Sequence, residues 1–236
     1  MKTLSIIVPA RNEEAEIANT IHGAFKALSK FNLSGEVIAV NDGSTDQTAV
    51  ILKDLQLLYP SLMVITHLKS QGLGAAFLSG IQSAKMDYAF LLPGDNENDP
   101  ESVMIHVADL NQEDVLVTYV ENPEERSAFR QKLSRIYTHI INLAFGHRLK
   151  YFNGTSLYKV SVIKKINLES RGFFFTAEIL LKLLRGEAQY KEVPIRLTNV
   201  KQTKSQALSW KSLKEVMKGF CRMLYWQYVI SRREAL

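Results

Sequence analysis

The chain has 236 residues, 46% hydrophobic and 22% charged, with a formal net charge of +5. This composition excludes a disordered chain and supplies enough apolar side chains for a sizeable core. The single cysteine, Cys221, excludes an intramolecular disulfide framework and a cysteine-ligated zinc cluster. Eight Lys and Arg residues but only two acidic residues lie in 201–236, so the whole positive excess lies in this tail. Such a tail predicts either a negatively charged partner or a solvated basic helix.

Strand and helix signals alternate through the first half of the chain. Short apolar, β-branched runs predict strands at 4–8, 36–40, 62–66, 88–92 and 114–119. Capping and turn residues predict that helices begin at Asn12, at Ser44 or Thr45, at Gly72 and near Pro100. This alternation predicts an α/β fold with a mostly parallel sheet and helices on both of its faces.

Three polar loops follow strands of this predicted sheet, at 10–13, 41–46 and 93–99, and each carries a carboxylate. Ligands of such sheets bind beyond the carboxyl ends of the strands. The loops therefore predict a ligand site at one edge. The glycine patterns of dinucleotide-binding and P-loop proteins are absent from the sequence, which argues against those two classes.

The second half is less regular. Apolar spacing predicts a long helix over 127–145, and a turn at 153–155 precedes a short strand. A further helix is expected to follow the capping residue Thr176 and to run to Leu184, with Gly186 ending it. The strand signal at 190–197 contains Pro194, which is typical of a sheet edge.

Three segments in order, 6–14, 40–46 and 72–80, resemble the opening motifs of the family 2 glycosyltransferases. Glu192–Ile195 and the later Lys204-Ser205 are similar to the end of the polyprenyl-phosphate sugar synthases, the group typified by dolichol-phosphate mannose synthase. The resemblance implies a GT-A fold over 1–207, with a nucleotide-sugar-binding half (1–120) and an acceptor half (121–207). A basic amphipathic helix is expected over 208–236.

The resemblance also implies a nucleoside diphosphate-sugar donor. Its loop for the nucleoside matches Pro9, Ala10, Asn12 and Glu13, its base-reading position matches Asn41 or Asp42, and its third motif contains Gly74. Lys201 and Lys204 are candidates to cover the donor diphosphate or the acceptor phosphate. A carboxylate or an amide can each pair with a base edge or with ribose hydroxyls. Asn41 stands where the family usually has Asp, so the base remains open.

The metal motif departs from the family pattern. Pro93 stands where the first Asp of Asp-x-Asp is usual, Asp95 matches the second, and Glu97 matches the polar residue that follows. The resemblance implies that Asp95 and Glu97 bind Mg²⁺ or Mn²⁺ together with diphosphate oxygens and water. The alternative is that Lys or Arg takes over the role of the metal.

Arg130 and Ser134 are four residues apart on a predicted helix and therefore share a face. A guanidinium and a hydroxyl in that arrangement can hold a phosphate, and the spacing resembles the acceptor clamp of the polyprenyl-phosphate synthases. The alternative is a basic surface helix. The segment 153–156 lacks the Arg that those synthases carry in a Ser-Gly-Phe-Arg motif.

The family inverts the anomeric centre by in-line displacement. A phosphate acceptor is already an anion and needs positioning rather than a base. A hydroxyl acceptor needs a general base, for which Glu178 and Asp99 are the candidates. Glu178 also has a plain interpretation as a carboxylate in the first turn of a helix.

The segment 210–230 combines apolar residues at helical spacing with Lys211, Lys214, Lys218 and Arg222. Such a helix suits a membrane interface, and the alternatives are docking on the protein's own core or on a second copy. No run of apolar residues is long enough for a spanning helix, so we expect a cytoplasmic protein, peripheral at the membrane.

The leading hypothesis is an inverting sugar transferase acting on a polyprenyl phosphate. The alternatives are transfer to a glycan or small-molecule hydroxyl, and a non-catalytic nucleotide-sugar-binding module. A nucleic-acid partner is not expected, because the basic tail carries no recognition motif.

Overall fold

The computed structural model describes residues 2–108, 110–200 and 209–230. The elements, in chain order, are β1 (Leu4–Ala10), α1 (Ile17–Lys30), β2 (Gly35–Asp42), α2 (Thr48–Leu58), β3 (Leu62–His67), α3 (Leu73–Ser83), β4 (Tyr88–Leu91), α4 (Pro100–Met104), β5 (Val115–Val120), the 3-10 turn η1 (Pro123–Glu125), α5 (Ala128–Phe145), β6 (Leu157–Lys159), α6 (Val160–Ile163), α7 (Phe175–Arg185), β7 (Tyr190–Ile195), α8 (Trp210–Tyr225) and the π-helical turn η3 (Trp226–Ile230).

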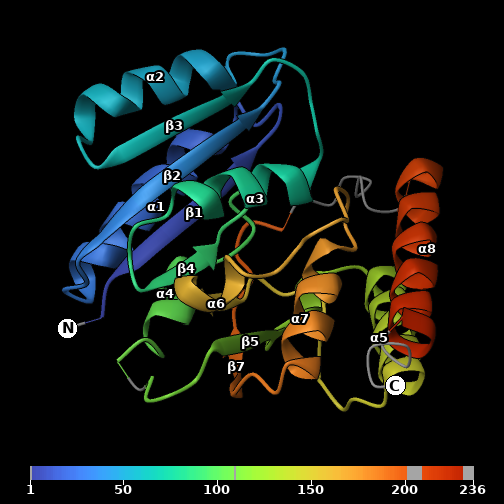
Figure 1. Cartoon of the computed structure of the whole chain (residues 1–236). Coiled ribbons are helices and arrows are strands. Elements are labelled where there is room, and N and C mark those ends of the chain that lie inside the picture. Colours follow the sequence, from blue (N-terminus) through green and yellow to red (C-terminus); the bar gives the residue numbers. More distant parts are fainter. Residues whose placement is uncertain (1, 109, 201–208, 231–236) are drawn as a thin grey trace.

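One seven-stranded sheet runs through both halves of the chain in the order β3-β2-β1-β4-β6-β5-β7 (Figure 1). β1 is parallel to β2 and β4, β2 is parallel to β3, and β5 is parallel to β7. Only β6 runs antiparallel to its two neighbours in the described sheet. The predicted mostly parallel sheet is confirmed. Pro194 lies in β7 at the sheet edge, where its missing N–H breaks no ladder.

Helices cover both faces of the sheet because successive strand residues point to opposite sides. In β1, Ile7 belongs to the cluster that contains the α3 and α7 side chains, while Ile6 and Val8 belong to the cluster formed with α1, α2 and α4. Gly80 lets α3 lie close to the sheet, since a Cβ there would lie 2.3 Å from the Cγ2 atom of Ile7. These two layers fix the strands whose ends carry the polar loops.

The prediction that Asn12 caps the first helix is wrong, because α1 begins only at Ile17. Asn12 has a φ of 56°, and its Oδ1 accepts the Thr45 N–H at 2.8 Å. The capping group is therefore used in a tertiary contact. The second helix likewise begins at Thr48, after the expected Ser44 or Thr45.

The apolar side chains of α8 divide between the protein and solvent. Phe220 packs edge-on against Phe145 of α5 with ring centroids 5.8 Å apart, and Met223 is buried. Met217 and Trp210 remain exposed. Within the described residues, we find no helix of the length and apolar character that crossing a membrane requires.

Candidate active site

A cavity of about 810 Å³ lies at the carboxyl ends of β1, β2 and β4. Its lining comes from residues 9–13 after β1, 70–73 before α3, 93–95 after β4 and 171–173 before α7, together with Asp42, Ala76, Glu97, Arg130, Ser209, Ser212 and Glu215. Of the predicted site residues, the cavity brings together Pro9, Ala10, Asn12, Glu13, Asp42, Asp95, Glu97 and Arg130. The cavity therefore lies where a ligand site was predicted, beyond the carboxyl ends of the parallel strands.

The first two motif loops are tied together by hydrogen bonds between their polar side chains and backbone. Besides the contact to Thr45, the Asn12 N–H donates to Ser44 Oγ at 3.0 Å. The Glu13 N–H donates to Thr48 Oγ1 at 2.9 Å. These bonds hold both loops at the cavity rim, so the motif residues have a structural task in addition to any contact with a ligand.

Asp42, at the end of β2, is almost fully buried and receives four hydrogen bonds. Its Oδ1 is 2.7 Å from His67 Nδ1 and 2.8 Å from the Gln71 N–H, and its Oδ2 is 2.7 Å from Ser70 Oγ and 2.9 Å from the Gly72 N–H. Burial alone raises the pKa of Asp42, but these donors together hold it below its ordinary value. An ionised carboxylate only accepts, so the network assigns a proton to His67 Nδ1.

Four bonds use about all the lone-pair positions that a carboxylate offers. In this conformation Asp42 fixes residues 70–72, which line the cavity in front of α3. Asn41 is also buried, lies outside the lining, and accepts the Ser44 N–H at 3.1 Å. Both side chains form hydrogen bonds to other residues of the chain. Recognition of the nucleotide base by Asn41 or Asp42 therefore stays a prediction.

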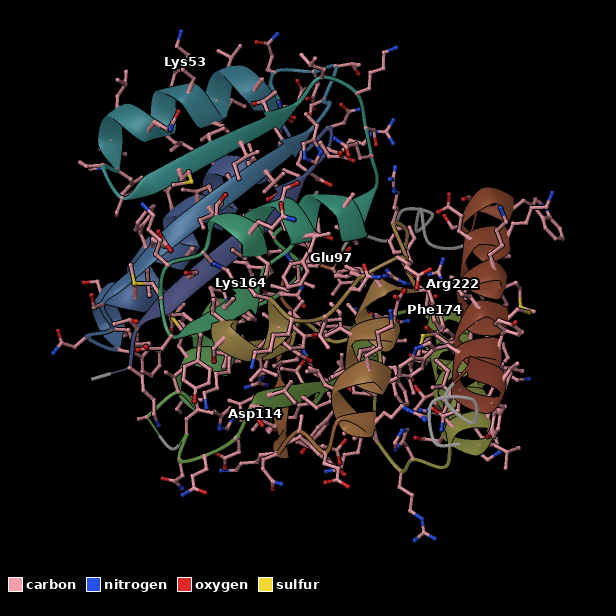
Figure 2. The ribbon with its side chains drawn as sticks, viewed as in Figure 1. Lys53, Glu97, Asp114, Lys164, Phe174 and Arg222 are labelled. Atoms are coloured by element: carbon pink, nitrogen blue, oxygen red, sulfur yellow. The ribbon has the colours of Figure 1, made fainter. Side chains whose placement is uncertain are left out.

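Asp95, Glu97 and Arg130 meet at the same cavity. Arg130 Nη2 lies 3.8 Å from Glu97 Oε2, and the Glu97 N–H donates to Asp95 Oδ1 at 3.2 Å. Figure 2 marks Glu97 among the side chains that converge there. No group of three His, Cys, Asp or Glu side chains suited to a metal is found among residues 2–108, 110–200 and 209–230. Two hard carboxylate donors fit part of a Mg²⁺ or Mn²⁺ shell that diphosphate and water complete.

Other predicted site residues lie away from the lining. Ser134 is on α5, one turn beyond Arg130, and Gly74 is in the first turn of α3. The Gly74 N–H donates to the Arg171 carbonyl at 2.7 Å, and a Cβ at Gly74 would lie 2.3 Å from the Ser170 carbonyl oxygen. Gly74 therefore permits a close approach of two segments. Lys204 lies outside the described residues, as do Lys201 and the side chain of Lys211.

Glu178 is fully buried in the first turn of α7 and does not line the cavity. Its oxygens lie 2.7 Å from Lys182 Nζ and 2.9 Å from Arg222 Nη2, and they accept the backbone N–H groups of Glu169 and Ser170 at 2.9 and 2.8 Å. Burial raises the pKa of Glu178, but Lys182 and the other donors hold it below its ordinary value. The structure thus does not bring this candidate base to the cavity, and Asp99 instead caps α4.

The sequence reasoning missed two parts of the lining. Arg171 and Phe173 come from the loop before α7, where Gly172 was the only local signal. Ser212 and Glu215 come from α8, where they are three residues apart and therefore share a face. That face meets the cavity only because α8 packs beside α7, which local spacing does not reveal (Figure 1).

Comparison with known families identifies the class of the protein. Residues 5–166 match the model of glycosyl transferase family 2, and the chain belongs to this family. The fold, with its carboxylates at the strand ends, agrees with that assignment.

Two curated relatives are transferases that act with polyprenyl phosphates, as their names state. The chain is 28% identical over 169 residues to a dodecaprenyl-phosphate galacturonate synthase of Rhizobium johnstonii, covering 70% of this chain and 50% of the relative. It is 32% identical over 144 residues to an undecaprenyl-phosphate 4-deoxy-4-formamido-L-arabinose transferase of Pseudomonas fluorescens, covering 60% and 40%. The chain therefore spans about half the length, or less, of these curated relatives.

Solved structures share the GT-A fold over most of the chain. Mannosyl-3-phosphoglycerate synthase of Rubrobacter xylanophilus superposes with a TM-score of 0.73 at 14% identity, covering 94% of this chain and 74% of that one. Glucosyl-3-phosphoglycerate synthase of Mycobacterium tuberculosis, solved with Mn²⁺, UDP and phosphoglyceric acid, gives 0.69 at 13%, covering 94% and 78%. At this identity the likeness confirms the predicted fold alone.

Proposed function

We propose that the protein transfers a sugar from a nucleoside diphosphate-sugar to a polyprenyl phosphate, with inversion at the anomeric carbon. The observation that carries the proposal is the convergence of Asp95, Glu97 and Arg130 on one cavity at the carboxyl edge of the sheet. Two carboxylates suit the metal-bound diphosphate of a donor, and a guanidinium suits the phosphate of an acceptor. The two polyprenyl-phosphate transferases among the relatives favour the same acceptor class.

The proposed reaction is a direct displacement at the anomeric carbon. An oxygen of the acceptor phosphate attacks the anomeric carbon while the bond to the donor diphosphate breaks, and the diphosphate leaves with the electron pair. The attacking oxygen is already anionic, so no side chain has to remove a proton. Arg130 orients the acceptor phosphate, and the loops at 9–13 and 70–73 bind the donor. Asp95 and Glu97 would hold a divalent cation, which would neutralise charge on the diphosphate.

We also propose that α8 lies on an anionic membrane surface, where a lipid acceptor resides. Trp210 and Met217 are exposed on this helix, and so are Lys214 and Lys218. Apolar side chains with interspersed lysines are typical of helices that bind in the interface. A K214E/K218E double variant is expected to lose sedimentation with vesicles that contain an anionic lipid.

The test is a transfer assay on the full chain with vesicles that contain either a polyprenyl phosphate or the corresponding polyprenol. UDP-, GDP- and CMP-linked sugars are supplied in turn, and the product is identified by mass spectrometry and its anomeric configuration by NMR. The proposal expects product only from the phosphate, with inverted configuration. Transfer to the polyprenol or to a soluble hydroxyl acceptor contradicts the acceptor, and a retained configuration contradicts the mechanism.

A further inference from the structure

The helix α8 forms one wall of the cavity. Ser209, Ser212 and Glu215 all belong to the lining, and Ser209 caps the helix by accepting the Ser212 N–H at 3.1 Å. A Cβ on Gly172 would lie 2.3 Å from Glu215 Oε2. The fit between α8 and the loop before α7 is therefore close at the cavity itself.

About one turn beyond Glu215, α8 is held against the core by a second close contact. A Cβ on Gly219 would lie 2.5 Å from Phe174 Cδ1, so only glycine lets the α8 backbone approach this side chain. Figure 2 shows Phe174 and Arg222 next to each other where α7 faces α8. The position of the cavity wall thus depends on how α8 sits on α7.

An ion pair joins the two helices at this place. Arg222 Nη2 of α8 is 2.9 Å from the buried Glu178 and 2.7 Å from Ser170 Oγ, and Arg222 Nε is 3.4 Å from Glu169 Oε2. Glu178 in turn accepts the N–H groups of residues 169 and 170, directly before the cavity-lining residue Arg171. One carboxylate therefore holds both the loop and the helix that close this side of the cavity.

The same side of the cavity lies next to α5. Arg130 is in the first turn of α5, and Ser209 starts α8, so both helices begin at the cavity. Beyond the cavity, Phe220 of α8 packs against Phe145 of α5, and Tyr228 Oη of the following turn η3 donates to the Ala144 carbonyl at 2.5 Å. The proposed phosphate ligand Arg130 and the α8 wall thus belong to one cavity, and their helices also contact each other at the opposite ends.

From these contacts we infer that Glu178 is a positioning residue: through Arg222 it seats α8 and sets the affinity for the acceptor. The acceptor assignment rests on the proposed function, whereas the seating of α8 does not. Glu178 acts through Arg222 and the 169–170 backbone and touches no reacting atom. The ion pair with Arg222 fixes α8 beside the cavity, whereas the backbone bonds to 169 and 170 also support the segment that packs against Gly72 and Gly74.

Arg222→Met is the variant of choice, because the Arg222 side chain is 36% exposed and Glu178 keeps Lys182 as a partner. Lys53→Met is the matched control, since it removes the same charge from an exposed position on α2, away from the cavity and from the proposed membrane face. Arg222→Lys restores the charge but presents a single ammonium in place of the forked guanidinium.

Hydrogen exchange is measured on the purified full chain, and KM is measured for donor and acceptor separately. Loss of a charged hydrogen bond of this kind predicts exchange in 209–225 that is about ten to a hundred times faster, with α1–α3 unchanged. In Arg222→Met the KM for the acceptor should rise about tenfold or more, for the same reason, while the KM for the donor should stay unchanged. Arg222→Lys should have a KM for the acceptor between those of Arg222→Met and the wild type. Unchanged exchange in α8 overturns the seating role, and an equal rise in both KM values overturns the acceptor assignment. If Arg222→Met shows the faster exchange in α8 but the wild type transfers no sugar, the proposed function is refuted and the seating role is not.

Discussion

Replacement of Asp42 by Asn tests whether this carboxylate holds the cavity loop in place. The change removes the charge and turns one accepting oxygen into an NH₂ group. His67 can change tautomer and the Ser70 hydroxyl can rotate, but the N–H groups of Gln71 and Gly72 cannot. Since these backbone groups bond to different oxygens of Asp42, one of them must face the new NH₂ group. One orphaned donor and the weakening of the remaining bonds predict a loss of about 2–4 kcal/mol in unfolding free energy.

Urea denaturation followed by far-UV circular dichroism measures this loss, with Asp54→Asn on the exposed face of α2 as the control, expected within about 0.5 kcal/mol of wild type. The pKa of Asp42 is lower in the folded than in the unfolded chain. The contribution of ionised Asp42 to the unfolding free energy is therefore complete above its pKa in the unfolded chain, about 4. This contribution disappears as the pH falls through its lower pKa in the folded chain. The wild type should approach Asp42→Asn only below about pH 4. A loss under about 1 kcal/mol, or a difference that persists undiminished at pH 2, refutes the reasoning.

The other predictions concern catalysis and packing. Asp95→Asn should lower the transfer rate at least about a hundredfold while circular dichroism and melting stay close to wild type, and an unchanged rate removes Asp95 from the site. Arg130→Ala should raise the acceptor KM about tenfold or more and leave the donor KM unchanged in steady-state kinetics, since its guanidinium is proposed to bind only the acceptor phosphate; equal effects on both contradict the clamp. Gly74→Ala, with its Cβ 2.3 Å from the Ser170 carbonyl, should lose about 1–3 kcal/mol in urea denaturation. Gly23→Ala, in a helix with space for the methyl group, should gain up to about 1 kcal/mol, and similar values for both variants contradict the packing argument.

The sheet and its site edge were predictable because their signals are local. The β-branched run from Leu4 to Val8 predicts β1, and residues buried on both faces give an apolar run with no alternation. The polar loop that follows each strand then locates the site by the direction of the strands. The cavity lining at Asp95 and Glu97 was predictable in this way, from their place in the chain rather than from any long-range contact, whereas metal binding by these two residues stays a prediction.

Predictions failed where a polar group has its partner in a distant segment. Asn12 has the residue type of a helix cap, but its side chain bonds to Thr45, 33 residues away. Glu178 has the residue type of a general base, but its partner Arg222 follows 44 residues later and holds it in the core. The part of the cavity formed by Ser212 requires the packing of α8 on α7, which no local pattern specifies.

The account depends on the cavity binding a nucleoside diphosphate beside Asp95, and ligand-induced thermal stabilisation tests this most directly. UDP, GDP and CMP are each added with and without Mn²⁺ to the wild type and to Asp95→Asn. A ligand present at about a hundred times its Kd adds about 2.7 kcal/mol, which corresponds to a rise in melting temperature of about 5–10 °C for a chain of this size. We predict such a rise with UDP or GDP, dependent on Mn²⁺ and lost in Asp95→Asn, and not with the monophosphate CMP. A rise of the same size in Asp95→Asn, or none with any nucleotide at millimolar concentration, contradicts the proposed donor site.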